Sequence, residues 1–534
     1  MRLPAPGTAA NSADPSRQVD DGGGRGTGRT YDEPRSRPRR FAHGPQGEID
    51  VSAYIGAIDW RHCPDTTDPI ECGTLEVPLD WDDPRGEKIH IGVSRVKAKD
   101  PGKRIGTAIM DPGGPGTSGV TDMVLRQGKV FSDAVRERFD VVTYDPRGVN
   151  TSSPITCDQA EADRVEAMKD PHSQADFDAL VAAKRQLSEN CRRLTGPLYD
   201  HTDTRQTVRD IDAIRAALGE EKITQIGYSY GTLAVQLYAQ MFPNRVRALV
   251  GDGNMDHLNV RTAWDLTSAG AGALEENFTQ FAKWCDMTPH CALYGRDTTK
   301  TYIEVRERAR RGTLTDPDTG KPVSFAALLR TANLANLPDR WREAASMIKS
   351  RYDGTPTGQV PPPPGGDGPP AGRVQLPHEV WFCQDWRMQV RDYAEWSALS
   401  ERLARSYPTV QWSPYANSAL DCVGYTGKTT YPQQPAHTGN APAMMLLGNV
   451  RDFATVYTWS QGAAKQTGAT LVTYEGYGHT IYPSTAHAGP SACINSIVED
   501  YLINLKLPAS GTRCPDIETP GGTGGPPPSP GTGG

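Results

Sequence analysis

A serine at the centre of the pentapeptide Gly227-Tyr228-Ser229-Tyr230-Gly231 has the G-x-S-x-G surroundings of a nucleophile elbow. Residues 223–227 before the serine form a short apolar run that predicts a buried strand, and a helix through residue 241 is predicted after it. This sharp turn, with glycines on both sides of the serine, would expose the hydroxyl at the carboxyl end of a sheet, above a helix N-terminus. We therefore predict that Ser229 is a nucleophile, which requires a neighbouring base to remove its proton.

Candidates for that base and for its supporting acid follow later in the chain, in the order acid and then histidine. His479 lies in a loop directly after a predicted strand, and Asp452 follows the preceding predicted strand at residues 443–447. Asp452 could orient the imidazole and stabilise its protonated form. Asp252, which follows a predicted strand at residues 246–250, is the competing acid. We prefer Asp452 because the acid must lie close to the histidine loop.

Two backbone N–H groups are predicted to form an oxyanion hole, which stabilises the negative charge that develops during acyl transfer. One belongs to Tyr230, and the other to Gly114 in the glycine-rich segment 113–116, which follows a predicted strand at residues 107–110. Residues 114–119 also match the dinucleotide pattern G-x-G-x-x-G, but a proline separates the first two glycines and no second cofactor signal accompanies them. No cofactor is expected, and no histidine–cysteine cluster has the spacing of a metal site.

The elements that would position these residues are alternating strands and helices. Short apolar runs suit buried strands, and residues 204–218 have helical periodicity with a capping residue at 203 or 204. This alternation predicts a mostly parallel sheet with helices on both faces. Together with the nucleophile elbow it predicts an α/β-hydrolase fold with an inserted, largely helical cap. The expected domains are a disordered segment (1–48), the first part of the core (49–253), a cap region (254–440) with a Pro/Gly-rich loop (353–370), the second part of the core (441–515) and a disordered tail (516–534).

The composition suits a large folded protein without affinity for polyanions. Hydrophobic residues make up 37% and charged residues 23% of the 534 residues, and the net charge is −7. A mildly acidic protein has no general attraction for nucleic acid or anionic membranes. No apolar run approaches the length that a membrane span requires. The sequence carries no signal for an oligomeric state.

Ten cysteines form an even, dispersed set, which favours disulfides and an extracellular location over free thiols. Residues 1–48 contain no apolar segment of an export signal. Sequential neighbours are expected to pair: Cys63 with Cys72, Cys157 with Cys191, Cys285 with Cys291, Cys383 with Cys422, and Cys493 with Cys514.

These motifs together resemble those of the secreted bacterial tripeptidyl aminopeptidases and their prolyl-aminopeptidase relatives. The resemblance covers most of residues 60–515 and rests on the segments 72–80, 111–116, 144–148, 227–232, 252–253 and 383–386. The sequence departs from the family pattern at Asn150, where a glycine is usual, and at residues 453–455 after the acid. The resemblance implies a serine exopeptidase that cleaves near a free N-terminus through an acyl-enzyme.

Such an exopeptidase needs a carboxylate to hold the protonated amine of its peptide substrate. Glu275, Glu276 and Asp385 are the candidates, and each could equally be an ordinary surface charge. A carboxylesterase on the same scaffold is the first alternative, because the triad alone does not distinguish esters from amides. A non-catalytic extracellular binding protein is the second, and the joint presence of serine, acid, histidine and oxyanion loop argues against it.

Overall fold

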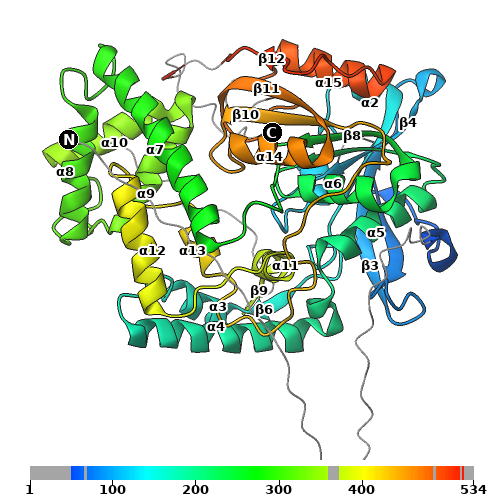
Figure 1. Ribbon diagram of the computed structural model, residues 1–534, viewed down its shortest axis with the longest axis horizontal. Coiled ribbons are helices and arrows are strands. Elements are labelled where there is room, and N and C mark those ends of the chain that lie inside the picture. Colours follow the sequence, from blue (N-terminus) through cyan, green and yellow to red (C-terminus); the bar gives the residue numbers. More distant parts are fainter. Residues whose placement is uncertain are drawn as a thin grey trace, which may run out of the picture. The chain divides into compact units, whose positions relative to one another are not determined.

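The computed structural model describes residues 50–64, 66, 69–358, 372–484, 489–517 and 520–521. The expected disordered segment at 1–48 lies outside this part of the chain, as do most of the tail and most of the Pro/Gly-rich loop. Within the described residues ten strands form one sheet (Figure 1). In spatial order they are β1 (Arg61–His62), β2 (Glu71–Pro78), β3 (Lys88–Val96), β5 (Phe139–Tyr144), β4 (Gly106–Asp111), β7 (Ile223–Tyr228), β8 (Val246–Asp252), β10 (Met445–Arg451), β11 (Thr470–Tyr477) and β12 (Arg513–Cys514).

The sheet is antiparallel at one end and parallel through its centre. The pairs β1–β2, β2–β3 and β3–β5 are antiparallel, whereas every pair from β5 to β12 is parallel. The predicted α/β-hydrolase fold with a mostly parallel sheet is confirmed. Because β4, β7, β8, β10 and β11 run in the same direction, the loops that follow them emerge at one edge of the sheet.

Helices cover both faces of the sheet because successive side chains of a strand point to opposite faces. Ile109 and Leu446 belong to one hydrophobic cluster, whereas their neighbours Ala108 and Met445 belong to another. The first cluster contains buried residues of α5 (Thr204–Ala217), α6 (Gly231–Met241) and α14 (Tyr457–Thr467). The second contains buried residues of α1 (Gly119–Leu125), α2 (Asp133–Arg138) and α15 (Ala492–Asn504).

Residues 253–444, called the insert below, lie between two strands that are direct neighbours. Val250 of β8 pairs with Met445 of β10, so the insert leaves the sheet and returns to it without interrupting the pairing. Its helices are α7 (Ala263–Met287), α8 (Thr298–Arg310), α9 (Phe325–Asn333), α10 (Trp341–Asp353), α11 (Pro377–Asp385), α12 (Tyr393–Ser406) and α13 (Ala416–Ala419). Aromatic residues such as Phe278 and Trp341 give the insert a hydrophobic core of its own.

A second addition precedes α5 and connects the insert to the rest of the fold. It contains β6 (Thr156–Asp158), α3 (Gln159–Glu166) and α4 (Gln174–Thr195), and β6 pairs with β9 (Arg373–Gln375) of the insert. The described residues, from residue 50 onward, belong to one compact unit. No helix among the described residues is long and apolar enough to cross a membrane.

All ten cysteines form disulfides, in the pairing that their order along the chain predicts: 63–72, 157–191, 285–291, 383–422 and 493–514. The bridge from Cys383 fixes the end of α11 to the segment after α13. The bridge from Cys493 fixes α15 to β12. The first of these two disulfides therefore cross-links two parts of the insert, and the second cross-links the last helix to the last strand of the sheet.

We expect the Cys383–Cys422 disulfide to stabilise the fold more than the Cys285–Cys291 disulfide. It closes a loop with a sequence separation of 39 rather than 6, and so restricts the unfolded chain more strongly. The chain-entropy relation gives a difference of about 1.7 kcal/mol. Non-reducing peptide mapping of the wild type first establishes the disulfides. The test then compares the free energies of unfolding of two variants, in each of which both cysteines of one of these disulfides are replaced by serine. Equal losses, or mostly free thiols in the map, would contradict the expectation.

Candidate active site

Ser229 lies in the turn between β7 and α6, at the sheet edge described above. Its φ angle of 55° is in the left-handed region, which residues other than glycine rarely adopt. Its N–H donates a hydrogen bond of 2.9 Å to the carbonyl oxygen of Asp252, at the end of the neighbouring strand. The predicted strand-turn-helix geometry around this serine is therefore present, and the side chain is partly exposed.

His479 and Asp452 form a hydrogen-bonded pair on the loops after β11 and β10. The Nδ1 atom of His479 lies 3.0 Å from each carboxylate oxygen of Asp452. The carboxylate is 1% exposed, and its Oδ1 also accepts the N–H groups of Ala454 and Thr455 at 2.8 and 2.9 Å. Because a carboxylate only accepts hydrogen bonds, the ring proton belongs on Nδ1, which leaves Nε2 free to accept a proton. Desolvation lowers the pKa of His479, but the Asp452 charge and hydrogen bond outweigh it, so the pKa is raised.

The histidine ring lies against the same backbone that holds the serine. A Cβ atom added to Gly253 would lie 3.0 Å from Cε1 of His479, and Gly253 directly follows the residue whose carbonyl binds the N–H of Ser229. A side chain at this position, where the φ angle is 69°, would crowd the imidazole. The loops after β7, β8, β10 and β11 thus bring Ser229, His479 and Asp452 into one region.

Asp252, the competing acid, has other hydrogen-bond partners. Its Oδ2 accepts the N–H groups of Ile481 and Tyr482, both at 2.8 Å, so it fixes the loop that follows the histidine. Complete burial raises the pKa of Asp252 to about 7. Among the described residues, Asp252 makes no hydrogen bond to the ring of His479, whereas Asp452 does.

The glycine-rich loop after β4 lies against the serine turn. A Cβ atom on Gly113 would lie 3.2 Å from Cβ of Ser229, so this glycine allows the loop to approach the nucleophile. Within the described part of the chain, the N–H groups of Gly114 and Tyr230 donate no backbone or side-chain hydrogen bond. The assignment of these two N–H groups to an oxyanion hole stays a prediction.

Asp111 and Tyr144 form a buried hydrogen-bonded pair under this loop, which the sequence analysis did not predict. The Oδ1 of Asp111 accepts the N–H of Gly113 at 3.2 Å, and its Oδ2 accepts the hydroxyl of Tyr144 at 2.6 Å. Burial raises the pKa of Asp111. Both residues lie in segments that carry the family resemblance, but their contact follows from the pairing of β4 with β5. Asp111 thus fixes the start of the predicted oxyanion loop.

The three candidates for binding a substrate amine lie in different surroundings. Glu275 accepts the N–H groups of residues 409 and 410, and so ties α7 to the segment after α12. Glu276 is exposed and hydrogen-bonds to Gln280 on its own helix. Asp385 is fully buried at the end of α11 and accepts the hydroxyl of Tyr230. Of the three, Asp385 is the one connected to the serine turn among the described residues.

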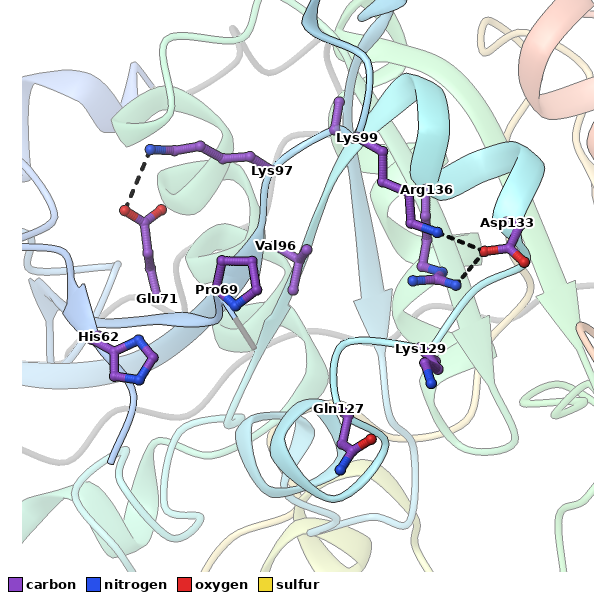
Figure 2. A pocket seen from close by; sticks show the side chains of 11 residues that line it. His62, Pro69, Glu71, Val96, Lys97, Lys99, Gln127, Lys129, Asp133 and Arg136 are labelled. Atoms are coloured by element: carbon purple, nitrogen blue, oxygen red, sulfur yellow. Dashed lines mark hydrogen bonds and ion pairs between the residues drawn. The ribbon is translucent and has the colours of Figure 1, made fainter. Parts of the chain in front are cut away.

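A groove of about 970 Å³ lies away from these side chains (Figure 2). Its walls come from β2, β3 and the region of α2, and none of the predicted site residues lines it. Ion pairs of Lys97 with Glu71 and of Lys99 with Asp133 cross its surface (Figure 2). The groove is therefore separate from the residues that could perform hydrolysis.

Comparisons with known proteins agree with this geometry. A model described as the alpha/beta hydrolase fold matches residues 109–314, and one described as TAP-like protein matches residues 407–514. A tripeptidyl aminopeptidase from Streptomyces lividans is 28% identical over 88% of this chain and 88% of its own. Serine protease Hip1 from Mycobacterium tuberculosis is 28% identical over 86% of this chain and 91% of its own. Carboxylesterase B from the same species is 30% identical over 85% of this chain and 89% of its own.

The fold and these relatives together define the class of protein: a serine hydrolase with an α/β-hydrolase fold. Within that class, the chain belongs to the family of the tripeptidyl aminopeptidases and their hydrolase relatives. This membership supports a serine hydrolase over the non-catalytic binding protein and agrees with the resemblance seen in the sequence.

Proposed function

We propose that the protein is a serine exopeptidase that releases short peptides, tripeptides or similar, from free N-termini. The observation that carries the proposal is the His479–Asp452 pair, held at 3.0 Å beside the strained serine turn. The tripeptidyl aminopeptidase and serine protease relatives support a peptide substrate.

In the proposed mechanism, Ser229 Oγ attacks the carbonyl carbon of the scissile amide while Nε2 of His479 accepts the hydroxyl proton. The N–H groups of Gly114 and Tyr230 stabilise the oxyanion of the tetrahedral intermediate. Collapse of this intermediate breaks the C–N bond, and His479 returns the proton to the leaving amine. Water then attacks the acyl-enzyme by the same steps and releases the N-terminal peptide as a carboxylate. Asp452 stabilises the imidazolium in both halves of the reaction.

The insert is the proposed cap that restricts this site to chain ends. It leaves the sheet after β8 and returns at β10, so it starts beside the serine turn. A Cβ atom on Gly116 of the oxyanion loop would lie 2.7 Å from Cγ of Pro377, at the start of α11. Contact between the insert and the oxyanion loop supports a role in admitting the substrate, because an enclosed site selects by shape and chain length.

We expect N-acetylation of a good peptide substrate to lower kcat/KM by about 10- to 150-fold. This range corresponds to a lost charge-assisted hydrogen bond of about 1.5–3 kcal/mol between the substrate ammonium and a carboxylate of the cap. The measurement compares chromogenic peptides with free and acetylated N-termini, at matched lengths of two to four residues. Equal cleavage of the free and acetylated peptides would exclude the exopeptidase.

A carboxylesterase is the second candidate, favoured by the relative named carboxylesterase B. The same triad would cleave an ester, because the attack and the oxyanion are alike in both reactions. A short-chain ester assayed beside the peptide panel separates the candidates by kcat/KM. Hydrolysis of the ester without measurable cleavage of any free peptide would replace the first proposal by the second.

We also propose that the protein acts outside the cell on peptide substrates. The support is the set of five disulfides, since such bonds form and persist in oxidising compartments. Isolation of the native protein from the culture medium with its disulfides intact would agree with this location. Recovery from the reducing cytosol with free thiols would contradict it.

A further inference from the structure

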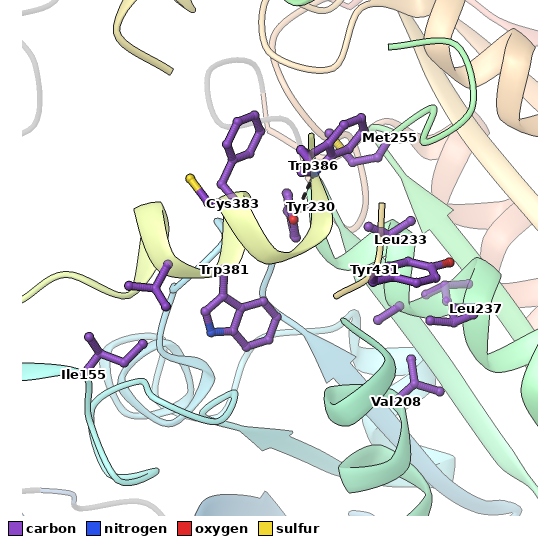
Figure 3. Packing of buried hydrophobic residues seen from close by; sticks show 14 of the residues in the cluster. Ile155, Val208, Tyr230, Leu233, Leu237, Met255, Trp381, Cys383, Trp386 and Tyr431 are labelled. Carbon is purple, nitrogen blue, oxygen red and sulfur yellow. Dashed lines mark hydrogen bonds between the residues drawn. The ribbon is translucent and has the colours of Figure 1, made fainter. Parts of the chain in front are cut away.

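Tyr230, the residue after the serine, has a buried hydroxyl that the proposed reaction does not use. The hydroxyl donates a hydrogen bond of 2.8 Å to Oδ2 of Asp385. It also accepts a hydrogen bond of 3.0 Å from Nε1 of Trp386 (Figure 3). Tyr230 is 5% exposed and packs in the large hydrophobic cluster of the core. The residue that would supply an oxyanion donor is therefore fixed through its side chain to the insert.

Asp385 is itself held from several sides. Its Oδ1 accepts the N–H of Thr204 at 2.9 Å, and its Oδ2 accepts the hydroxyl of the same threonine at 2.6 Å. Its backbone carbonyl accepts a hydrogen bond of 2.8 Å from Nε2 of His257, on the segment after β8. Burial lowers the pKa of His257 to about 4, so this ring is neutral and serves as a fixed donor. The end of α11 thus joins α5, the serine turn and the start of the insert.

This arrangement leaves no open path for a substrate amine to the Asp385 carboxylate. The residue is 0% exposed, and its two oxygens already accept three hydrogen bonds from Thr204 and Tyr230. An ammonium group would have to enter a closed interior and displace one of these donors. The contacts instead indicate a carboxylate that orients its neighbours.

We propose that Asp385 is a positioning residue, which acts through the Tyr230 hydroxyl to hold the N–H of Tyr230 in the geometry of the oxyanion hole. This inference rests on the proposed hydrolytic mechanism and deepens it. An oxyanion donor stabilises the transition state most when it is oriented before the charge develops. Only two torsion angles connect the Tyr230 hydroxyl ring to the backbone. Fixing the hydroxyl at Asp385 therefore restricts the orientation of the Tyr230 peptide group. The insert therefore contributes to catalysis as well as to substrate entry.

The first test is Tyr230→Phe, which removes the hydroxyl and keeps the ring. We expect kcat to fall about 10- to 100-fold with little change in KM. Loss of an entire oxyanion donor lowers kcat by about 10²- to 10³-fold, and a displaced donor should lower it by less. The affinity for a trifluoromethyl ketone analogue, whose tetrahedral adduct carries an oxyanion, should fall by a similar factor. An inhibitor without an oxyanion, such as the product peptide, should bind as before.

Tyr238→Phe is the matched control, because Tyr238 lies on α6, the helix that follows the turn. Its buried hydroxyl donates a hydrogen bond of 2.8 Å to Oδ1 of buried Asp212, so the same chemical group is lost. Both variants should lose comparable thermal stability, but Tyr238→Phe should keep the wild-type kcat. If the two variants have the same kcat, Tyr230 has only a structural role and the proposal is wrong.

Asp385→Ala, which removes the acceptor of the Tyr230 hydroxyl, separates positioning from amine binding. A positioning residue predicts the same fold-loss of kcat on free peptides, acetylated peptides and a short ester. An amine-binding carboxylate predicts a loss confined to free peptides, and that result would overturn the proposal. The ester also separates the failure of the two proposals. If the wild-type enzyme cleaves only the ester, the proposed peptidase activity is wrong. The effect of Tyr230→Phe on ester hydrolysis then still decides whether Asp385 is a positioning residue.

Discussion

Replacement of Ser229 by alanine is expected to abolish turnover and leave the fold intact. The variant lacks the oxygen that forms the acyl-enzyme, and loss of a triad member in comparable hydrolases costs about 10⁴–10⁶ in rate. Its stability should change little, because the side chain is partly exposed and alanine is smaller than serine. Steady-state hydrolysis and thermal unfolding of the purified variant measure the two quantities.

Ser173→Ala provides a control for this serine. Ser173 caps α4 because its side-chain oxygen accepts a hydrogen bond from the N–H of Asp176, so its loss should cost about 1 kcal/mol of stability. Activity should remain at the wild-type level, because α4 carries none of the proposed catalytic residues. A fluorophosphonate probe should label the wild type and Ser173→Ala but not Ser229→Ala. Undiminished turnover by purified Ser229→Ala would disprove the assignment of the nucleophile.

The parts of the structure that the sequence predicted well are those with local signals. The apolar run at 223–227 became β7, which ends one residue later, and Asp203 caps α5 through the N–H groups of residues 205 and 206. Ser229, Asp452 and His479 each follow a strand closely, so the order of elements was enough to propose them together. Parallel strands then bring their loops to one edge, whatever the length of chain between them.

The parts that could not be predicted depend on contacts between distant residues. Asp385 was a candidate for binding an amine because its carboxylate was visible in the sequence while its burial was not. Its contact with Tyr230 spans 155 positions and depends on how the insert returns to the core. The Asp111–Tyr144 hydrogen bond likewise depends on β5 lying beside β4. Sequence patterns indicate where strands end, but not which side chains meet there.

The second prediction with a large expected effect on kcat concerns which aspartate, Asp452 or Asp252, supports His479. The different hydrogen-bond partners of the two carboxyl groups predict the outcome. In Asp452→Asn, the amide oxygen is expected to stay on the N–H groups of Ala454 and Thr455, which Oδ1 now accepts. The amide nitrogen would then face Nδ1 of His479 and donate to it. This arrangement places the ring proton on Nε2, the atom that must accept the proton of Ser229. We expect kcat to fall about 10⁴-fold, as for loss of the correct tautomer in a comparable triad.

Asp252→Asn should have a far smaller effect, of about tenfold or less in kcat, which corresponds to about 1.4 kcal/mol. The asparagine oxygen can accept both N–H groups of the loop after His479, where Oδ2 of Asp252 accepts them at 2.8 Å. Burial raises the pKa of Asp252 to about 7, so part of the population is already neutral at neutral pH, and the amide resembles that form. Parallel measurement of kcat for both variants decides the assignment. A dead Asp252→Asn beside an active Asp452→Asn would show that the acid follows β8, and that the Asp452–His479 contact serves only to hold the loop.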